Sequence, residues 1–324
     1  MRAVRITSLD GPRAVEIADV DAPTPDDGKV LIDVHAAGVT FPDVLQTRGL
    51  YQIKPPVPFT PGSEVAGVVR VAPEGSGFTE GQRVAAFVGF GGFCETIAAD
   101  PATVFPLPDR MSFAHGAAVP MNVLTAHFAL RRRTTLCEGE TVLVHGAAGG
   151  VGSASIQLAK ALDARVIGVV SSDAKAELAR AAGADDVVYA DGFKDAVKEL
   201  TGGRGVDVVV DPVGGDRFTD SLRSLAREGR LLVIGFTAGE IPTVKVNRLL
   251  LNNISVVGVA WGEFFLHRMA YLHEQWDDLW PLLAAGKLDP HIGARYPLDK
   301  AADALASMDE RTAVGKIVLE VVSE

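Results

Sequence analysis

The residues with the clearest chemical meaning form a glycine-rich turn in the middle of the chain. The sequence reads TVLVHGAAGGVGSASIQLAKAL, so a strand-like apolar run leads into Gly146, Gly149, Gly150 and Gly152, and a helical pattern follows at once. Glycines let a chain turn tightly and bring its N–H groups close to a pyrophosphate, which the positive end of the helix dipole also attracts. A turn that only packs helix on strand would not need four glycines, since each one costs backbone entropy. The context therefore predicts a dinucleotide-binding turn.

The second strand of this region indicates which dinucleotide is bound. An NAD-binding protein usually ends that strand with a carboxylate that binds the ribose hydroxyls. Here ARVIGVV ends at Val170, and Ser171, Ser172 and Lys175 follow. Two hydroxyls, the N–H groups of a helix start and an ammonium would attract a 2′-phosphate, which a carboxylate would repel. The sequence predicts NADPH; the alternative for Lys175 is an ordinary surface lysine, and Asp173 beside it weakens the positive field.

Metal-binding residues are scarce and scattered along the chain. The two cysteines, Cys94 and Cys137, form neither a disulfide framework nor a four-thiolate zinc site. The seven histidines show no ligand spacing, and His145, which follows the first strand of the region, is predicted to be a core or cofactor-adjacent group. We therefore expect no bound metal, and two isolated thiols fit a reducing cytoplasm.

The charge and the hydropathy pattern exclude several classes of partner. The net charge is −10, and an acidic surface repels phosphate, which disfavours nonspecific binding to nucleic acid or to an anionic membrane. No apolar run is long enough to span a membrane, and the first residues, MRAVRITSLDG, lack the apolar core of a signal peptide. We expect a cytoplasmic protein that acts on a small molecule, without a nucleic-acid or membrane partner.

The patterns around the glycine turn predict two domains. Between residues 121 and 261, strand-like runs such as DDVVYA, VDVVVDPVGG and RLLVIG alternate with helical ones such as DAKAELARAAG, FKDAVKELTGG and FTDSLRSLAREG. This alternation indicates a doubly wound parallel sheet buried on both faces. Residues 1–120 carry short strand-like runs such as VLIDVHAAGV and EVAGVVRVA, and SFAHGAAVPMNVLTAHFALRRRT reads as helical. Residues 262–324, which end with the strand-like GKIVLEVV, are expected to complete that first domain.

Several motifs together resemble the medium-chain dehydrogenase/reductase superfamily, and within it the quinone oxidoreductase or ζ-crystallin branch. They are AAGVTFPDVLQTRGLY, FTPGSEVAGVV, VHGAAGGVG, GVVSSDAK and RTAVGKIVL, and the resemblance covers essentially the whole chain. It implies an α/β fold in which a Rossmann doubly wound parallel sheet is inserted in a GroES-like β-barrel domain, with the active site in the cleft between them. It also implies a homodimer, for which the edge strand NISVVGVA is a candidate contact.

The resemblance further implies which residues bind the cofactor. They are Phe41, Asn122, Thr125, Gly149, Gly150, Val151, Ser171, Ser172, Lys175, Tyr189, Gly235, Phe236, Thr237 and Arg311. Within this set, Lys175 and Arg311 match the positions that hold the 2′-phosphate in the branch. Tyr189 is one position out of register with a tyrosine that touches the adenosine phosphate.

The same matching of positions bears on zinc and on catalysis. Zinc-dependent relatives have a cysteine where this chain has Thr40 and a histidine where it has Ser63, and neither Thr nor Ser competes well for zinc. The cysteine-rich lobe that holds a structural zinc is also missing. Thr40 and Tyr51 match substrate-cleft positions of the branch and are the expected catalytic residues, as hydrogen-bond donors to a developing oxyanion, although the branch usually has Asn at Thr40.

The expected lack of zinc limits the reactions that remain. Without a Lewis acid nothing lowers the pKa of a simple alcohol, so we expect an NADPH-dependent quinone oxidoreductase that transfers hydride without zinc. The alternative is NADPH-dependent reduction of an α,β-unsaturated carbonyl, in an alkenal, an enone or an enoyl thioester. A non-catalytic, ζ-crystallin-like role would leave a damaged turn or a basic face, and neither is present. Phe41, Trp261, Phe264 and Phe265 are candidate walls for a flat acceptor, with core packing as the alternative. Asp43 is interpreted as a helix-start residue, with a cleft carboxylate as the alternative.

Overall fold

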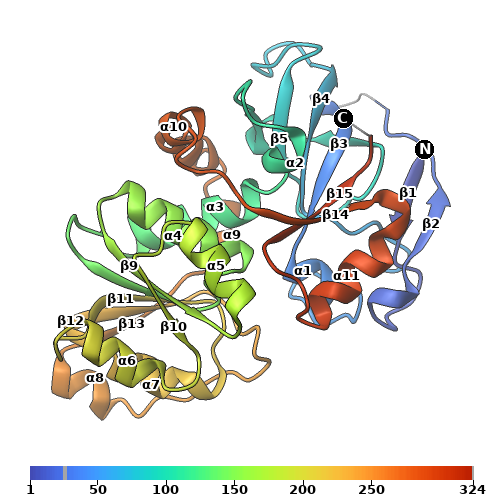
Figure 1. Ribbon diagram of the computed structural model, residues 1–324. Coiled ribbons are helices and arrows are strands. Elements are labelled where there is room, and N and C mark those ends of the chain that lie inside the picture. Colours follow the sequence, from blue (N-terminus) through green and yellow to red (C-terminus); the bar gives the residue numbers. More distant parts are fainter. Residues whose placement is uncertain (25–27, 323–324) are drawn as a thin grey trace. The chain divides into compact units, whose positions relative to one another are not determined.

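The computed structural model describes residues 1–24 and 28–322, which divide into two compact units. The first unit contains Met1–Met121, Met269–Ala284 and Pro290–Glu324, and the second contains Asn122–Arg268 and Ala285–Asp289. Both ends of the chain belong to the first unit, and most of the second is inserted between them (Figure 1). The division differs from the expected boundaries in two ways: Met121 lies in the first unit, and residues 262–268 and 285–289 lie in the second.

Among the described residues, the second unit is built on a parallel sheet of six strands. They are β8 (Thr141–Val144), β9 (Arg165–Val170), β10 (Asp186–Tyr189), β11 (Val206–Asp211), β12 (Leu225–Val233) and β13 (Ser255–Gly258). The strands lie in the order β10-β9-β8-β11-β12-β13, so the winding direction reverses between β8 and β11. This is the Rossmann strand order, which opens a binding crevice at the carboxyl ends of the strands on either side of the switch point.

Helices cover both faces of this sheet (Figure 1). Helices α4 (Gly150–Ala161) and α5 (Asp173–Ala181) lie on one face, and α6 (Phe193–Leu200), α7 (Phe218–Arg223) and α8 (Asn247–Asn252) lie on the other. Every residue of β8 and of β11 is buried, which explains their unbroken valine-rich sequences. Helix α7 is shorter than FTDSLRSLAREG predicts, because Leu225 already pairs with Val206 in the sheet.

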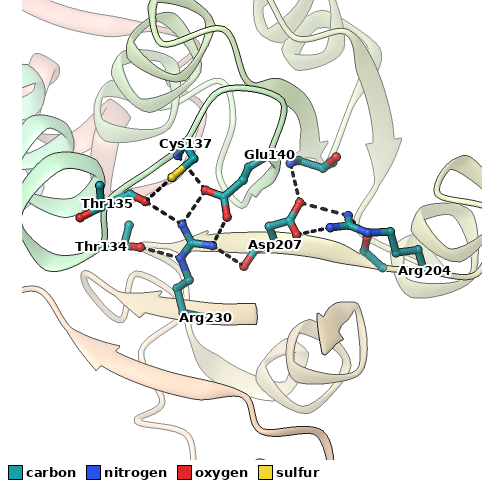
Figure 2. A network of polar contacts seen from close by, with 9 residues as sticks. Thr134, Thr135, Cys137, Glu140, Arg204, Asp207 and Arg230 are labelled. Carbon is teal, nitrogen blue, oxygen red and sulfur yellow. Dashed lines mark hydrogen bonds and ion pairs between the residues drawn. The ribbon is translucent and has the colours of Figure 1, made fainter. Parts of the chain in front are cut away.

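Two arginines tie together the amino-terminal ends of these strands (Figure 2). Arg230 of β12 donates to both carboxylate oxygens of Glu140, at 2.5 and 2.7 Å. Arg204 binds the carboxylate of Asp207 in β11, and Asp207 also accepts the Thr141 N–H of β8 at 2.8 Å. These charge-assisted bonds fix three neighbouring strands at the edge opposite the glycine turn.

The first unit is built on a mixed sheet. Its strands lie in the order β14-β15-β3-β4-β5-β7, with β6 paired to β3, and all pairs are antiparallel except β14 with β15. The pairing of Ile317 in β15 with Val39 in β3 joins the two ends of the chain. A separate two-stranded sheet contains β1 (Arg2–Arg5) and β2 (Glu16–Asp19). The bounds of the main strands are β3 (Val30–Val39), β4 (Glu64–Val71), β5 (Arg83–Phe87), β6 (Thr96–Ala99), β7 (Val104–Pro106), β14 (Ile292–Pro297) and β15 (Lys316–Glu320).

Short helices complete the first unit. Helix α1 (Phe41–Gln46) follows β3 directly, α11 (Ala301–Asp309) packs on α1, and α2 (Phe113–Gly116) contacts β3 and β4. In α10 (Tyr271–Ala284), the ring of Trp276 stacks on Phe105 at 4.5 Å and its Nε1 donates to Pro106 O at 3.1 Å. The proline-rich run YQIKPPVPFTPG forms no helix and only an isolated bridge at Phe59, as its composition predicts.

The helical stretch predicted between residues 112 and 134 is divided into three pieces. After α2 come α3 (Pro120–His127) and a π-helical segment, Phe128–Arg133. Pro120 begins α3, where its missing N–H costs nothing. Among the residues described, no helix has both the length and the apolar character that a membrane crossing requires.

Candidate active site

The glycine-rich turn lies at the switch point of the parallel sheet. It connects the end of β8 at Val144 to the start of α4 at Gly150. Gly146 has a left-handed φ of 58°, and Gly149 N–H donates to its carbonyl oxygen at 2.8 Å. A Cβ on Gly152 would lie 2.1 Å from Gly146 O, so only glycine lets the helix approach the turn this closely. The tight bend and the helix start are the features that a pyrophosphate-binding turn requires.

Helix α3 brings two further predicted residues to this turn. A Cβ on Gly150 would lie 2.7 Å from Asn122 Nδ2, so the Asn122 side chain lies directly against the first turn of α4. Thr125, almost one helical turn further along α3, is buried like Asn122. Both residues therefore lie on the helix that borders the glycine turn.

A second group of predicted residues gathers where β9 and β10 end. Ser171 and Ser172 follow β9, and the Lys175 ammonium donates to Ser171 Oγ at 3.3 Å. Tyr189, the last residue of β10, donates from its hydroxyl to Asp173, the first residue of α5. The sequence did not predict this bond. It provides a hydrogen-bond donor to Asp173, whose negative charge would otherwise weaken the positive field around Lys175.

The loop after β12 supplies Gly235, Phe236 and Thr237. Its Thr237 N–H donates to Pro212 O at 3.2 Å, so the loop lies beside the residues that follow β11. Phe236 is partly exposed. The predicted cofactor residues of the second unit therefore lie at or just after the carboxyl ends of β8, β9, β10 or β12, or on α3. Arg311 belongs to the first unit, where it follows α11 with a left-handed φ of 58°.

The first unit buries a polar cluster where β3 meets α1. The N–H and the Oγ1 of Thr40 both donate to Asp43 Oδ2, at 2.7 and 2.6 Å. Gly62 N–H donates to Asp43 Oδ1 at 3.2 Å, and Ser63 Oγ lies 3.3 Å from Thr40 Oγ1. Asp43 is 0% exposed and Thr40 4% exposed. Asp43 is the predicted helix-start residue, but its carboxyl group is also buried and accepts a hydrogen bond from the Thr40 hydroxyl.

A buried ion pair lies beside this cluster. Lys316 Nζ donates to Glu64 Oε1 at 2.5 Å and to Val39 O at 2.8 Å, and Glu64 Oε2 accepts the Met121 N–H at 2.6 Å. The two side chains are 4% and 0% exposed. Sequence reasoning did not find this pair, because its members are 252 positions apart and meet only when β15 joins β3.

Burial and neighbouring charges perturb the pKa values of Asp43 and of Tyr51. Burial raises the pKa of Asp43 to about 6, although its bonds to Thr40 and the charge of Lys316 act in the opposite direction and Glu64 raises it further. Burial, together with the charge of Asp43, also raises the pKa of Tyr51. The Tyr51 hydroxyl is therefore a neutral donor at physiological pH.

The candidate walls have different environments. Phe41, the first residue of α1, is half-buried beside Thr40 in the sequence. Trp261 and Phe265 of α9 (Trp261–Leu266) are each 4% exposed, and their ring centroids lie 4.7 Å apart. Core packing therefore accounts for Trp261 and Phe265, and Phe41 remains a predicted site residue.

Thr40 and Ser63, the residues expected at the zinc-ligand positions of zinc-dependent relatives, have their hydroxyl oxygens 3.3 Å apart. Across residues 1–24 and 28–322, no group of three or more His, Cys, Asp or Glu side chains is placed to hold a metal ion. Cys94 is buried, which raises the pKa of its thiol to about 12, and Cys137 is exposed.

His145 is a core residue at the end of the first strand, as one of the two interpretations predicted. Its Nε2 lies 2.8 Å from Ser221 Oγ, which itself donates to Arg217 O, so His145 carries its proton on Nε2. Its Nδ1 is buried without a hydrogen-bond partner among the described residues. Burial lowers the pKa of His145 to about 4, so the ring is neutral at physiological pH.

A Rossmann sheet with a glycine-rich turn, joined to a β-rich unit that carries a buried polar cluster, defines a two-domain dehydrogenase. Residues 26–109 match the family described as alcohol dehydrogenase GroES-like domain, and residues 150–285 match the family described as zinc-binding dehydrogenase. The chain belongs to the medium-chain dehydrogenase/reductase superfamily, in its quinone oxidoreductase branch, and is an oxidoreductase of that family. The predicted family and fold class are thereby confirmed.

Three relatives illustrate this membership. Quinone oxidoreductase-like protein 2 of Rattus norvegicus is 40% identical over 325 residues, covering 99% of this chain and 92% of the relative. The solved structure of a probable oxidoreductase from Mycobacterium abscessus has a TM-score of 0.91 and 47% identity, covering 99% of this chain and 98% of the other. The quinone oxidoreductase of Thermus thermophilus, solved also in complex with NADPH, has a TM-score of 0.85 and 34% identity, covering 99% and 100%.

Proposed function

We propose that this chain is an NADPH-dependent oxidoreductase that transfers hydride to a quinone without zinc. The observation that carries the proposal is the hydroxyl pair of Thr40 and Ser63, 3.3 Å apart, at the two positions where zinc-dependent relatives have ligands. Without a metal that polarises the substrate, the acceptor must take hydride readily, and quinones do so. Sequence relatives that carry the name quinone oxidoreductase support the same acceptor class.

NADPH fits the residues at the carboxyl edge of the parallel sheet. Gly149, Gly150 and Val151 would hold the pyrophosphate, because the first N–H groups of α4 have no acceptor within the helix. Ser171, Ser172, Lys175 and Arg311 would hold the 2′-phosphate, with Tyr189 at the adenosine end. Asn122 and Thr125, with Phe41, would border the nicotinamide, and Gly235, Phe236 and Thr237 would line the cofactor between them. When bound, NADPH supplies the hydride.

Two residues of the first unit would act on the acceptor. Thr40 and Tyr51 would donate hydrogen bonds to its oxygen as negative charge develops there. Because the pKa of Tyr51 is raised, its hydroxyl keeps its proton throughout the physiological pH range.

We further propose that the protein acts as a homodimer in the cytoplasm. Strand β13 is at the edge of its sheet, and the adjoining helix α8 exposes Leu250 and Leu251, which are 76% and 71% exposed. An unpaired edge beside exposed leucines is a surface that a second copy would cover. Light scattering after gel filtration tests this: twice the chain mass of 34.1 kDa is expected, with a shift toward monomer in Leu250→Glu.

The acceptor class is tested by following NADPH oxidation in EDTA with benzoquinone, phenanthrenequinone and an α,β-unsaturated aldehyde, each in a separate reaction. Turnover of the quinones that EDTA leaves unchanged supports the proposal, whereas turnover of the aldehyde alone identifies an ene-reductase. Stoichiometric zinc in the purified protein would overturn the zinc-free mechanism.

The coenzyme preference is tested by a matched pair of lysine variants. Lys175→Ala should raise the KM for NADPH about 10- to 100-fold, since a hydrogen bond to a charged group contributes about 1.5–3 kcal/mol, and should leave the KM for NADH unchanged. The exposed Lys198→Ala on α6 should change neither constant. An equal effect of Lys175→Ala on both coenzymes would show that Lys175 does not bind the 2′-phosphate.

A further inference from the structure

We infer that Asp43 controls the Thr40 hydroxyl, as a positioning residue that turns this hydroxyl toward the acceptor and passes a proton through it. The inference rests on the proposed function, in which Thr40 faces the acceptor. It starts from the three hydrogen bonds that Asp43 accepts, from the contact between Thr40 and Ser63, and from the number of protons available to these groups.

When Asp43 is ionised, the Thr40 hydroxyl points inward. A carboxylate only accepts hydrogen bonds, and the described contacts give it three donors: the N–H and Oγ1 of Thr40 and the N–H of Gly62. The single hydroxyl proton of Thr40 is then used at Asp43 Oδ2, 2.6 Å away. In this state Thr40 can accept a bond, for example from Ser63 Oγ at 3.3 Å, but has no proton to offer an acceptor oxygen.

When Asp43 is protonated, the direction of this bond reverses. The Oδ2–H of the acid donates to Thr40 Oγ1, and its remaining acceptor sites still serve the N–H groups of Thr40 and Gly62. No bond within the cluster is lost. The hydroxyl proton of Thr40 is now free to point away from Asp43, so the same side chain becomes the oxyanion donor that the proposed reaction requires.

The acid form also supplies the proton that the reaction consumes. Reduction of a quinone to a hydroquinone adds one hydride and one proton, so the oxygen that gains charge must receive a proton. Thr40 Oγ1–H breaks as the new O–H bond forms on the acceptor, and Asp43 Oδ2–H breaks as Thr40 regains a hydroxyl proton. The acceptor leaves neutral and Asp43 becomes a carboxylate, which a proton from solvent restores before the next turnover.

The surroundings of Asp43 make both protonation states accessible. Burial raises its pKa to about 6, the charge of Lys316 on β15 lowers it, and Glu64 on β4 raises it. Helix α11, which packs on α1, brings Asp309, but this carboxylate is paired with Arg48 and partly exposed. The ion pair of Lys316 with Glu64 leaves little net charge beside Asp43, so burial decides the balance.

The other proton donor of the site is distinguishable from Asp43 by its titration. Tyr51 has a pKa raised above its ordinary value near 10. A change in rate near pH 6 therefore reports Asp43, and a change at high pH reports Tyr51.

The test is the pH dependence of kcat/KM for a quinone between about pH 5.5 and 8.5, in wild type, Asp43→Asn, Thr40→Val and Thr40→Ser. Wild type should lose about tenfold in kcat/KM for each pH unit above about 6, because only the acid form donates. Asp43→Asn and Thr40→Val should have flat profiles. Thr40→Val should be about 10²- to 10⁴-fold slower than wild type at the acid end and should approach it at the alkaline end. Thr40→Ser should keep the profile.

Two further measurements exclude a merely structural effect. The matched control is Asp303→Asn, which removes an exposed carboxylate from the first turn of α11 in the same unit and should leave the profile unchanged. A solvent deuterium isotope effect should be present in wild type and absent in Thr40→Val, because only wild type moves the relayed proton. Carbon NMR of aspartate-labelled protein without NADPH should show one resonance, missing in Asp43→Asn, that titrates at the midpoint of the rate profile.

Each outcome bears on the inference. An unchanged inflection in Asp43→Asn, or a carboxyl resonance that titrates without any change in rate, would overturn it. If Asp43→Asn does not fold, the profile and isotope effect of Thr40→Val decide. Turnover of quinones with a flat wild-type profile refutes the role of Asp43 but leaves the proposed function intact. Absence of turnover with every acceptor refutes the proposed function, and the inference with it.

Discussion

The buried ion pair of the first unit gives the sharpest prediction about stability. In Lys316→Met, Glu64 would lose its ion-pair partner at 0% exposure, with the Met121 N–H as its one remaining donor among the contacts described above. Removing one partner of a buried pair costs about 3–5 kcal/mol, because the other charge is left desolvated and uncompensated. The carbonyl of Val39 would also lose its donor at 2.8 Å. We therefore expect a destabilisation of about 3–5 kcal/mol, confined to the first unit.

Hydrogen exchange measured by mass spectrometry is the suitable assay, because it reports on each unit separately. Peptides from β3 and β15 should exchange about 10²- to 4 × 10³-fold faster in Lys316→Met, since about 1.4 kcal/mol corresponds to a factor of ten. Peptides from β8 and β11 should be unchanged. The matched control is Lys160→Met in the second unit, where the pair with Asp185 is about one-third exposed on each side and should contribute less than about 1 kcal/mol.

A double variant separates the charge effect from simple loss of packing. In Lys316→Met combined with Glu64→Gln, the amide oxygen still accepts the Met121 N–H and no charge is buried. This variant should recover at least half of the lost protection in β3 and β15. Exchange in Lys316→Met within about threefold of wild type, or a double variant no better than the single one, would refute the reasoning.

Three other predictions concern the second unit. Gly152→Ala should lower NADPH affinity at least tenfold, because its Cβ would lie 2.1 Å from the Gly146 carbonyl oxygen in the turn. In Gly149→Ala the new Cβ would lie 3.3 Å from the same oxygen, so circular dichroism should show an intact fold. As the pH falls from about 6.5 to 4, the free energy of unfolding of wild type should decrease by up to about 3 kcal/mol, as measured by urea titration. This decrease should be absent in His145→Gln. In this pH range the His145 ring binds a proton in the unfolded chain but stays neutral in the folded protein, where its pKa is lowered to about 4. Arg230→Met should lower the free energy of unfolding by about 1–3 kcal/mol, measured by denaturant unfolding. Arg223→Met, which removes an exposed ion pair, should lower it by less than about 1 kcal/mol.

The sequence predicts best those features that local patterns determine. The valine-rich β8 and β11 and the turn from Gly146 to Gly152 carry their own signals, because a strand buried on both faces is apolar throughout and a tight turn needs glycine. Strand β14 was missed, since IGARYP contains Gly293 and Pro297, alternates between partly buried and exposed residues, and is defined by its pairing with β15. The residues of FTDSLRSLAREG after Arg223 favour helix locally, but pairing with β11 overrides that preference.

The candidate site also contains residues that local patterns predict and contacts that depend on distant parts of the chain. Asp43 was interpreted as a helix-start residue, and the structure places it in the first turn of α1, yet it also accepts the Gly62 N–H from a distant loop. The bond from Tyr189 to Asp173 depends on β10 lying beside β9. Contacts of this kind come from strand order and register, which no window of neighbouring residues contains.

The joining of the two ends of the chain in one sheet has a consequence for synthesis on the ribosome. Lys316 meets the Val39 carbonyl 277 positions earlier in the chain, so at about 5–20 residues per second β3 waits roughly 14–55 s for its β15 partner. The inserted second unit ends at Asp289, so its last residue is synthesised before Lys316. During the delay the edge of β3 is an open template for other strands, so nascent chains should depend on chaperones at this stage. A ribosome that stopped shortly before Lys316 would release a protein with a folded Rossmann unit and a first unit that lacks β15.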